Sequence, residues 1–147
     1  MMNKALFSSN RKDWETPPDF FKKYDDSFRF TIDACATPQN AKCRQYFTKE
    51  DDGLTKDWGG HRVWCNPPYG REISKWVKKA SEEAQKPHTI VVMLLPARTD
   101  TAWFHDYILG KASVQFIRGR IKFVGATTSA PFPSMVVTFA SGMYVPK

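Results

Sequence analysis

Hydrophobic and polar positions along the chain follow two patterns, one typical of strands and one typical of helices. Residues 89–95 form a continuous apolar run, which predicts a strand buried on both faces, as in a parallel sheet. In residues 28–32 aromatic side chains alternate with polar ones, which predicts a strand with Asp33 near its carboxyl end. Three shorter apolar segments complete the predicted sheet, at residues 62–65, 114–117 and 135–139.

Three helices are predicted beside these strands. The first spans residues 17–24, with Thr16 as its N-cap and Pro17 at the first helical position. The second spans residues 71–86, where apolar side chains recur at helical spacing, and the third spans residues 100–109. Strands that alternate with helices predict an α/β fold, a sheet with helices on its faces in three layers.

The remaining segments are predicted to be loops. Residues 37–60 hold turn formers and acidic residues, with room for a short helix and short strands. Residues 119–134 form a long connection that contains Gly, Arg and Pro. Residues 1–13 are mixed and polar, and their composition fits both a mobile leader and a segment that folds over a ligand. We expect a single domain over residues 1–147.

Composition adds a charge bias. The 147 residues include 22 Lys and Arg against 15 Asp and Glu, a formal charge of +7, which favours a polyanionic partner such as nucleic acid without identifying it. The three cysteines are widely spaced and include no C-x-x-C pair, so we expect neither a disulfide framework nor a metal site. With no signal-type or membrane-spanning apolar run, we expect a cytoplasmic protein without a membrane partner.

The segment Asn66-Pro67-Pro68-Tyr69 carries the clearest candidate chemistry. It follows a predicted strand, and ligands of open α/β sheets gather beyond the carboxyl ends of strands. The Asn oxygen and a neighbouring backbone carbonyl can each accept one hydrogen of a planar amino group, which prepares its nitrogen to attack an activated methyl group. The prolines hold these acceptors rigidly, and the Tyr69 ring can stack on a base swung out of its duplex. We predict that all four residues are catalytic.

The same four residues could form a plain turn, because Asn and Pro are favoured in turns for local reasons. Here, however, they follow a hydrophobic strand and precede Gly70 and an amphipathic helix. This context favours the catalytic interpretation.

Segments spread over nearly the whole chain resemble the phage-type DNA N-6-adenine methyltransferase (Dam) family. They include Phe30-Thr31-Ile32-Asp33-Ala34-Cys35-Ala36, Asp52-Gly53-Leu54, Asn66-Pro67-Pro68-Tyr69-Gly70, Leu95-Pro96-Ala97-Arg98-Thr99-Asp100-Thr101 and Ala130-Pro131-Phe132-Pro133-Ser134. The resemblance implies a reduced class I (Rossmann-like) S-adenosylmethionine-dependent methyltransferase fold. It also implies methyl transfer to the N6 amino group of adenine in double-stranded DNA, with base flipping, with GATC as the expected site, and in a bacterial host of a phage or prophage.

The resemblance extends to the cofactor site. The predicted cofactor-binding residues are Thr16, Pro17, Asp33, Ala34 and Asp52. Thr16 begins a segment similar to the N-terminal cofactor-contacting motif of amino-methyltransferases, and Asp33 stands where their first-strand motif would be. The usual Gly-rich turn is replaced by Ala-Cys-Ala-Thr-Pro after Asp33. Asp57 is an alternative to Asp52, and all three acids could instead be solvated or, for Asp33, cap a helix.

Six residues are predicted to contact DNA: Arg71, Arg98, Thr99, Arg118, Arg120 and Lys122. Arg98 and Thr99 follow the buried strand, where contact with DNA and capping of the next helix by Thr99 or Asp100 are both open. Residues 111–122 contain four basic side chains and no acid, which suits phosphate contact, with a solvated basic face as the alternative. We expect no separate target-recognition domain, so loops or a partner would read the sequence.

Two other functions remain open. The tetrapeptide also resembles that of enzymes that methylate a protein glutamine amide, a chemically similar nitrogen. A non-enzymatic DNA-binding remnant would keep the fold and charge after losing cofactor affinity. The breadth of the resemblance and the basic charge favour the DNA methyltransferase.

Overall fold

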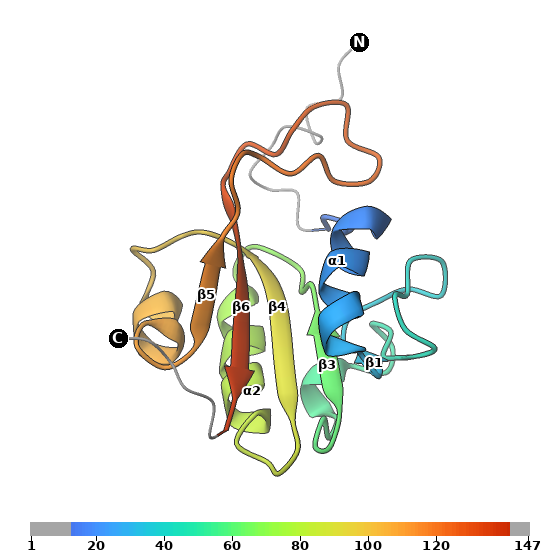
Figure 1. Ribbon diagram of the computed structural model, residues 1–147, viewed down its shortest axis with the longest axis vertical. Helices are drawn as coiled ribbons and strands as arrows, with labels where there is room; N and C mark the ends of the chain where they lie inside the picture. Colours follow the sequence, from blue (N-terminus) through green and yellow to red (C-terminus); the bar gives the residue numbers. More distant parts are fainter. Residues whose placement is uncertain (1–12, 142–147) are drawn as a thin grey trace.

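A mixed sheet of six strands forms the centre of the structure (Figure 1). The computed structural model describes residues 13–141. The strands are β1 (Ile32–Asp33), β2 (Gln45–Tyr46), β3 (Arg62–Cys65), β4 (Ile90–Pro96), β5 (Ser113–Phe116) and β6 (Ser134–Ala140). The helical elements are α1 (Pro18–Phe28), the short 3-10 turn η2 (Gly53–Thr55), α2 (Ile73–Glu83) and the π-type turn η3 (Phe104–Ile108).

The strand order across the sheet brings several carboxyl ends together. The order is β2-β1-β3-β4-β6-β5; the first four strands are parallel, and β6 is antiparallel to both β4 and β5. Because two reversals restore the direction, β5 runs parallel to β4. The strand ends at Asp33, Cys65, Pro96 and Phe116 therefore lie along one edge, the upper edge in Figure 1, which we call the carboxyl edge.

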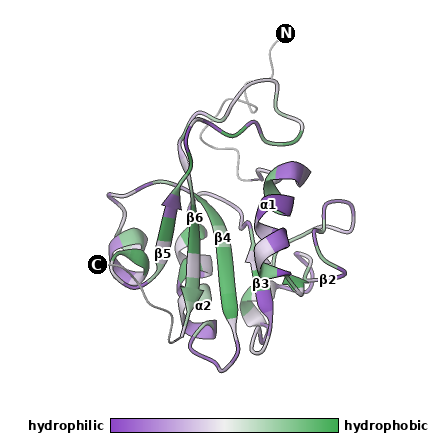
Figure 2. Cartoon of the chain, in the orientation of Figure 1, coloured by the Kyte–Doolittle hydropathy of each residue, from purple (hydrophilic) through white to green (hydrophobic). Residues whose placement is uncertain are grey.

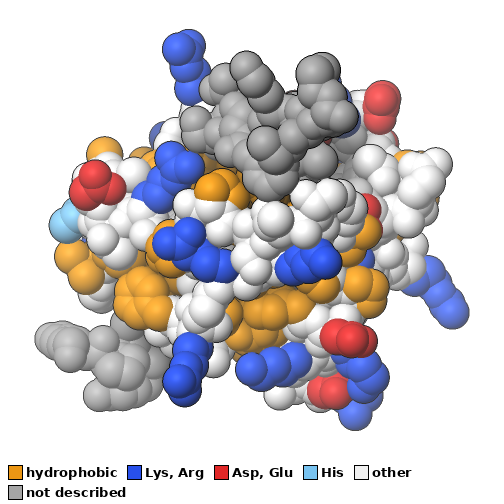
Figure 3. All heavy atoms as spheres, turned by 90° about the horizontal axis from the view of Figure 1, so that it is seen from above, with side chains coloured by type: hydrophobic (Ala, Val, Ile, Leu, Met, Phe, Trp, Pro, Cys, Tyr) orange, Lys and Arg blue, Asp and Glu red, His pale blue; other side chains and the backbone are white. Residues whose placement is uncertain are grey.

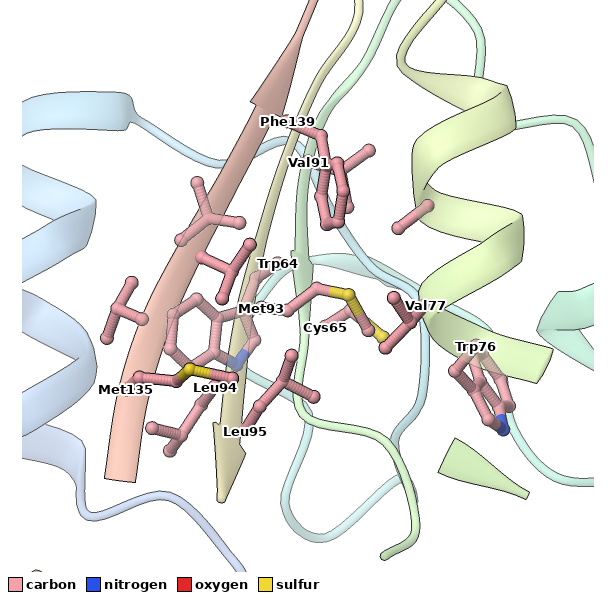
Figure 4. Close-up of a cluster of buried hydrophobic side chains, with 14 of the residues drawn as sticks. Trp64, Cys65, Trp76, Val77, Val91, Met93, Leu94, Leu95, Met135 and Phe139 are labelled. Atoms are coloured by element: carbon pink, nitrogen blue, oxygen red, sulfur yellow. The ribbon is translucent and has the colours of Figure 1, made fainter. Parts of the chain in front are cut away.

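Helices cover both faces of this sheet (Figure 1). On one face, the Trp64 ring of β3 contacts the ring of Phe21 in α1 and the ring of Phe30, at centroid distances of 5.2 and 5.5 Å. On the other face, Val77 of α2 lies beside Cys65 and Met93 (Figure 4). The result is an α/β domain of helix, sheet and helix layers. Within residues 13–141, no helix is long and apolar enough to cross a membrane.

The hydrophobic centre of the sheet is formed by β4 and β6 (Figure 2). Residues 91–95 of β4 are fully buried, because β3 and β6 pair with both of its edges and helical elements lie over the sheet. Burial of one such aliphatic side chain contributes about 1.5–3 kcal/mol. This strand therefore supplies a rigid support for the loops at the carboxyl edge.

Most of the predicted elements are confirmed. β3 has the predicted bounds, β4 lies one residue later than predicted, and α2 lies within the predicted helix at residues 71–86. β5 and β6 overlap the predicted strands, and the segment at residues 37–60 holds only β2, η2 and loops. Each confirmed element has either a continuous apolar run or a clear period.

The predicted strand at residues 28–32 is wrong over most of its length. Phe28 is the last residue of α1, and Arg29 ends the helix in the left-handed region with φ 52° while its N–H bonds back into the last turn. Only Ile32–Asp33 is a strand. The alternating aromatic side chains pack on each other instead, with the rings of Phe28 and Phe30 stacked at 5.5 Å.

Two predictions about helix ends are also wrong. Thr16 does not cap α1; Pro17 is the N-cap, and no side chain accepts a capping hydrogen bond there. The predicted helix at residues 100–109 begins two residues later than expected: residues 102–108 are helical and end in η3, because turns with backbone hydrogen bonds from Arg98 to Pro96 and from Thr101 to Arg98 occupy the start of that segment.

The loop after β2 packs tightly against the end of β1, which predicts an effect of substitution at Gly53. A Cβ atom there would lie 2.3 Å from the Ala34 carbonyl oxygen, so we expect Gly53→Ala to lower the free energy of unfolding by about 3 kcal/mol. Gly60→Ala is the matched control, because its Cβ would meet nothing within 4 Å and only the positive φ of 78° opposes it, at about 1 kcal/mol. Urea unfolding of both variants measures the difference, and equal losses would contradict the close approach.

Candidate active site

The segment Asn66-Pro67-Pro68-Tyr69 directly follows β3 at the carboxyl edge. Proline lacks the N–H that a strand ladder needs, so β3 ends at Cys65 while its neighbour β4 continues to Pro96. The structure therefore brings the four predicted catalytic residues to the edge where ligands of such sheets bind.

The side-chain amide of Asn66 is held by its nitrogen end. Nδ2 donates to the carbonyl oxygen of Trp14 and to Oγ1 of Thr16, the latter at 2.9 Å. A carbonyl oxygen can only accept, so the contact with Trp14 fixes which end of the amide is the NH2 group. The other end, Oδ1, is buried without a hydrogen-bond partner among the described residues. The amide thus presents a free acceptor of fixed orientation.

Buried polar atoms without partners gather near this edge. Within residues 13–141 they are Asn66 Oδ1, Ser134 Oγ and Trp76 Nε1. Ser134 pairs with Pro96 at the end of β4, and the Trp76 ring packs beside Gly53, close to the end of β1. A buried polar atom left unpaired costs about 1–3 kcal/mol, so Asn66 Oδ1 and Ser134 Oγ, which lie at strand ends of this edge, favour a polar ligand there.

The ring of Tyr69 is buried rather than displayed. Its side chain is 3% exposed, its hydroxyl donates to the Leu94 carbonyl at 2.9 Å, and its ring meets that of Phe132 edge-on at 5.7 Å. Burial raises the pKa of the Tyr69 hydroxyl well above its ordinary value, so the hydroxyl stays protonated as a donor. A base could stack on this ring only after the groups that bury it, Phe132 among them, moved.

Residues 117–133 join β5 to β6 and extend above the sheet (Figure 1); we call them the β5–β6 arm. The arm pairs with the segment before α1 through the Val124 N–H and the Glu15 carbonyl, 3.1 Å apart. The Trp14 ring packs against Phe123 at 5.4 Å and Phe132 at 5.1 Å. Backbone and aromatic contacts therefore hold the arm over the predicted catalytic segment.

Asp33, the predicted first-strand cofactor residue, lies at the end of β1 and is buried. Its two carboxylate oxygens accept the N–H groups of Cys35 at 3.2 Å and Lys42 at 3.0 Å. Burial raises the pKa of this carboxyl to about 6, although both N–H groups act in the opposite direction. Ala34 is fully buried and donates its N–H to the Trp64 carbonyl, so it belongs to the strand ladder.

The remaining predicted cofactor residues differ in their placement. Thr16 is buried against Asn66, and Pro17 beside it is the N-cap of α1. Asp52 is exposed after β2, and one of its oxygens accepts the Leu54 N–H. Asp57 is paired with Lys86 at 2.8 Å, which favours Asp52 as the ligand. Carboxylate and hydroxyl groups of this kind fit the ammonium and hydroxyl groups of a nucleoside-linked amino acid.

The predicted DNA-contacting residues are all exposed and follow the strands that end at the carboxyl edge. Arg71 follows the β3 loop, Arg98 and Thr99 follow β4, and Arg118, Arg120 and Lys122 follow β5. Seen from above this edge, Lys and Arg side chains spread over the face, with fewer Asp and Glu (Figure 3). Near Thr99, the hydroxyl that accepts a turn N–H belongs to Thr101.

Cysteine chemistry contributes little here. Burial raises the pKa of the Cys35 and Cys43 thiols to about 12 and that of Cys65 well above its ordinary value, so all three are neutral thiols at pH 7. His61 contacts the Thr31 hydroxyl through Nδ1. In the part of the chain that the structure describes, no group of three or more His, Cys, Asp or Glu could hold a metal ion.

Sequence reasoning missed three residues of the site. Trp14 contributes a backbone carbonyl, which no side-chain pattern can reveal. Trp76 lies on the apolar stripe of α2, where its indole nitrogen gives no separate signal. Ser134 stands at the end of a segment that resembles the Dam family, so only that resemblance pointed to it.

Comparison with known proteins identifies the family. The family model described as DNA N-6-adenine-methyltransferase (Dam) matches residues 4–138. The DNA N-6-adenine-methyltransferase of Haemophilus phage HP1 (strain HP1c1) is 32% identical over 148 residues, which cover 95% of this chain and 85% of that protein. The DNA N-6-adenine-methyltransferase of Escherichia phage T1 is 34% identical over 106 residues, 71% of this chain and 44% of that protein. The putative methyltransferase YfdM of Escherichia coli (strain K12) is 35% identical over 63 residues, 38% of this chain and 69% of that protein. The chain therefore belongs to the DNA N-6-adenine-methyltransferase (Dam) family.

Proposed function

We propose that this chain transfers a methyl group from S-adenosylmethionine to the N6 amino group of adenine in duplex DNA. The observation that carries the proposal is the Asn66 amide, whose nitrogen is held by Trp14 and Thr16 while Oδ1 is buried without a partner among the described residues. Such an acceptor suits a hydrogen-bond donor that arrives with the substrate. The names of the two phage relatives support adenine in DNA as that substrate.

The chemistry requires an improved and aligned nucleophile. The amino group of adenine is a poor nucleophile because its lone pair is delocalised into the ring. Asn66 Oδ1 and a backbone carbonyl of the following prolines would each accept one amino hydrogen, which directs the nitrogen lone pair toward the methyl group. The cofactor, when bound, supplies that methyl group in an activated sulfonium form. Pro67 is buried and Pro68 half-buried, which supports a fixed position for the carbonyl.

The residues that would hold the cofactor are Thr16, Pro17, Asp33, Ala34 and Asp52. Asp33 and Asp52 offer carboxylate oxygens to ammonium and hydroxyl groups near the ends of β1 and β2. The Thr16 hydroxyl accepts from Asn66 and donates to no described residue, so its hydrogen remains available to a ligand. A reduced Rossmann-like binding mode is supported by the parallel order β2-β1-β3-β4 with these residues at its carboxyl edge.

DNA binding is supported by charge and position. Exposed basic side chains follow β3, β4 and β5 at the same edge of the sheet as Asn66. Phosphate contacts of this kind position a protein on DNA, while base contacts specify the sequence. We propose that the β5–β6 arm and the loop after β4 contact the duplex, with GATC as the expected target.

Access to the adenine amine requires base flipping, because the amine lies within the duplex. The Tyr69 ring would stack on the extruded base, once Phe132 has moved aside. Stacking on an aromatic ring contributes about 1–3 kcal/mol per base, which offsets part of the unstacking free energy.

Labelled S-adenosylmethionine tests the function directly. Incorporation into DNA, with protection of GATC sites from a restriction enzyme that adenine methylation blocks, is the expected result. Incorporation into protein glutamine and none into DNA would establish the alternative amide methyltransferase. If no transfer occurs, calorimetry detects no binding of S-adenosylhomocysteine and the chain still binds DNA, the chain is a DNA-binding remnant.

Substitution of Asn66 tests the acceptor. We expect Asn66→Ala to lower the rate of methyl transfer by a factor of about 10²–10³, the usual effect of losing one preorganised hydrogen-bonding group, while cofactor affinity remains. Asn66→Asp should be similarly impaired at neutral pH, because a carboxylate oxygen would face the Trp14 carbonyl in place of a donor. Single-turnover kinetics and calorimetry with S-adenosylhomocysteine measure both effects. Full activity of either variant would reject the role given to Asn66.

Tyr69 separates stacking from hydroxyl chemistry. We expect Tyr69→Phe to methylate DNA within about twofold of the wild type, because stacking needs only a ring, and to lose about 1 kcal/mol of stability with the bond to the Leu94 carbonyl. Tyr69→Leu keeps an apolar side chain without a ring and should be about tenfold slower. Rates are compared at temperatures where both variants are folded. A Phe variant as slow as the Leu variant would contradict the stacking role.

Lys122 tests contact between the arm and the DNA backbone. The logarithm of the DNA-binding constant falls linearly with the logarithm of salt concentration, and losing one phosphate contact makes this negative slope less steep by about 0.9. We therefore expect Lys122→Ala to bind DNA more weakly and with a shallower slope. Lys78→Ala is the matched control, since Lys78 is also exposed but lies on the outer surface of α2. Fluorescence anisotropy at several salt concentrations measures the slopes. Identical slopes for the two variants would contradict a contact between Lys122 of the arm and the DNA backbone.

A further inference from the structure

We propose that Thr16 is a positioning residue: its hydroxyl, together with the Trp14 carbonyl, holds the Asn66 side chain in the orientation that methyl transfer requires. The inference rests on the proposed function and adds to it. Thr16 was expected to cap α1 or to bind the cofactor, and the structure gives its hydroxyl a different partner.

The geometry distinguishes two anchors with different effects. The Trp14 carbonyl can only accept, so it selects which end of the Asn66 amide faces the N-terminal segment. With this hydrogen bond alone, the amide plane could still rotate about the Cβ–Cγ bond of Asn66. The second bond, 2.9 Å from Nδ2 to Thr16 Oγ1, uses the other N–H and fixes the plane. Both hydrogens of Nδ2 then have partners, and Oδ1 is left as a directed acceptor.

The setting of Thr16 is rigid enough for this role. The side chain is 3% exposed, and Pro17 and Pro18 follow it, whose rings restrict the backbone on the carboxyl side. On the amino side, the Glu15 carbonyl is bonded to Val124 of the arm. The hydroxyl therefore sits in a fixed place relative to the end of β3, and its removal would leave one Nδ2 hydrogen without its partner.

The test compares Thr16→Val with Thr16→Ser in the full chain. We expect Thr16→Val to lower the single-turnover rate at saturating cofactor about tenfold, with the KM for DNA within twofold of the wild type. Thr16→Ser restores the hydroxyl and should recover the rate. Thr89→Val is the matched control: Thr89 is also 3% exposed and its Oγ1 accepts one N–H, from Gly60, but it lies before β4 at the opposite edge of the sheet. Its rate should equal that of the wild type.

Three outcomes would overturn the inference. They are an unchanged rate in Thr16→Val, a rate in Thr16→Ser as low as in Thr16→Val, and a loss confined to cofactor affinity, which would make Thr16 a cofactor ligand only. A wild type that methylates no DNA refutes the proposed function instead.

A measurement on the wild type tests the two hydrogen bonds without relying on enzymatic activity or on the folding of a variant. In the wild type, the Asn66 side-chain NH2 hydrogens should exchange with solvent at least tenfold more slowly than those of an exposed Asn, as followed by NMR. Exchange at the rate of a free side chain would refute the hydrogen bonds themselves, whether or not the chain methylates DNA.

Discussion

The two hydrogen bonds donated by the Asn66 amide join the end of β3 to residues 50 and 52 positions earlier in the chain. The rest of the site depends on them. They place the segment before α1, and with it the Trp14 ring, against which the β5–β6 arm packs through Phe123 and Phe132. Phe132 in turn covers the Tyr69 ring. The Asn66 side chain therefore connects the positions of three segments that are far apart in the sequence.

Because these segments are linked, moving Phe132 away from the Tyr69 ring costs free energy. Phe132 contacts the rings of Trp14, Tyr69 and Phe123, and aromatic pairs contribute about 0.5–1.5 kcal/mol each, so displacing Phe132 costs on the order of 2–4 kcal/mol. Stacking of one base on Tyr69 would return about 1–3 kcal/mol. The two quantities nearly balance, so under the proposed function phosphate contacts made by the basic side chains of the arm would decide whether the site opens. Under the proposed function, the closed arrangement would discriminate against ligands that lack a nucleic-acid backbone.

The elements that depend on a local sequence pattern were predicted correctly. The interactions between residues that are distant in the sequence were not predicted. β3, α2 and β4 were predictable because their apolar residues recur at the period of the element or without interruption. The strand at residues 28–32 was wrong because one residue, Arg29, adopts a left-handed conformation that no alternation reveals. Asn66 was found from its neighbours in sequence, whereas the role of Thr16 was missed because its partner lies 50 residues away and its own neighbours suggest a helix cap.

At the end of β1, the Asp33 side chain binds backbone N–H groups that a Gly-rich turn would leave available to a ligand. A Gly-rich turn presents backbone N–H groups to anionic parts of a ligand. Here the Asp33 carboxylate accepts the N–H groups of Cys35 and Lys42, so both are used within the protein and the loop presents a carboxylate instead. With its pKa at about 6, the carboxyl is mostly ionised at neutral pH, and a ligand ammonium beside it would favour the charged form further. Under the proposed function, this departure from the usual turn would suit recognition of the cationic amino group of the cofactor rather than of its anionic carboxylate.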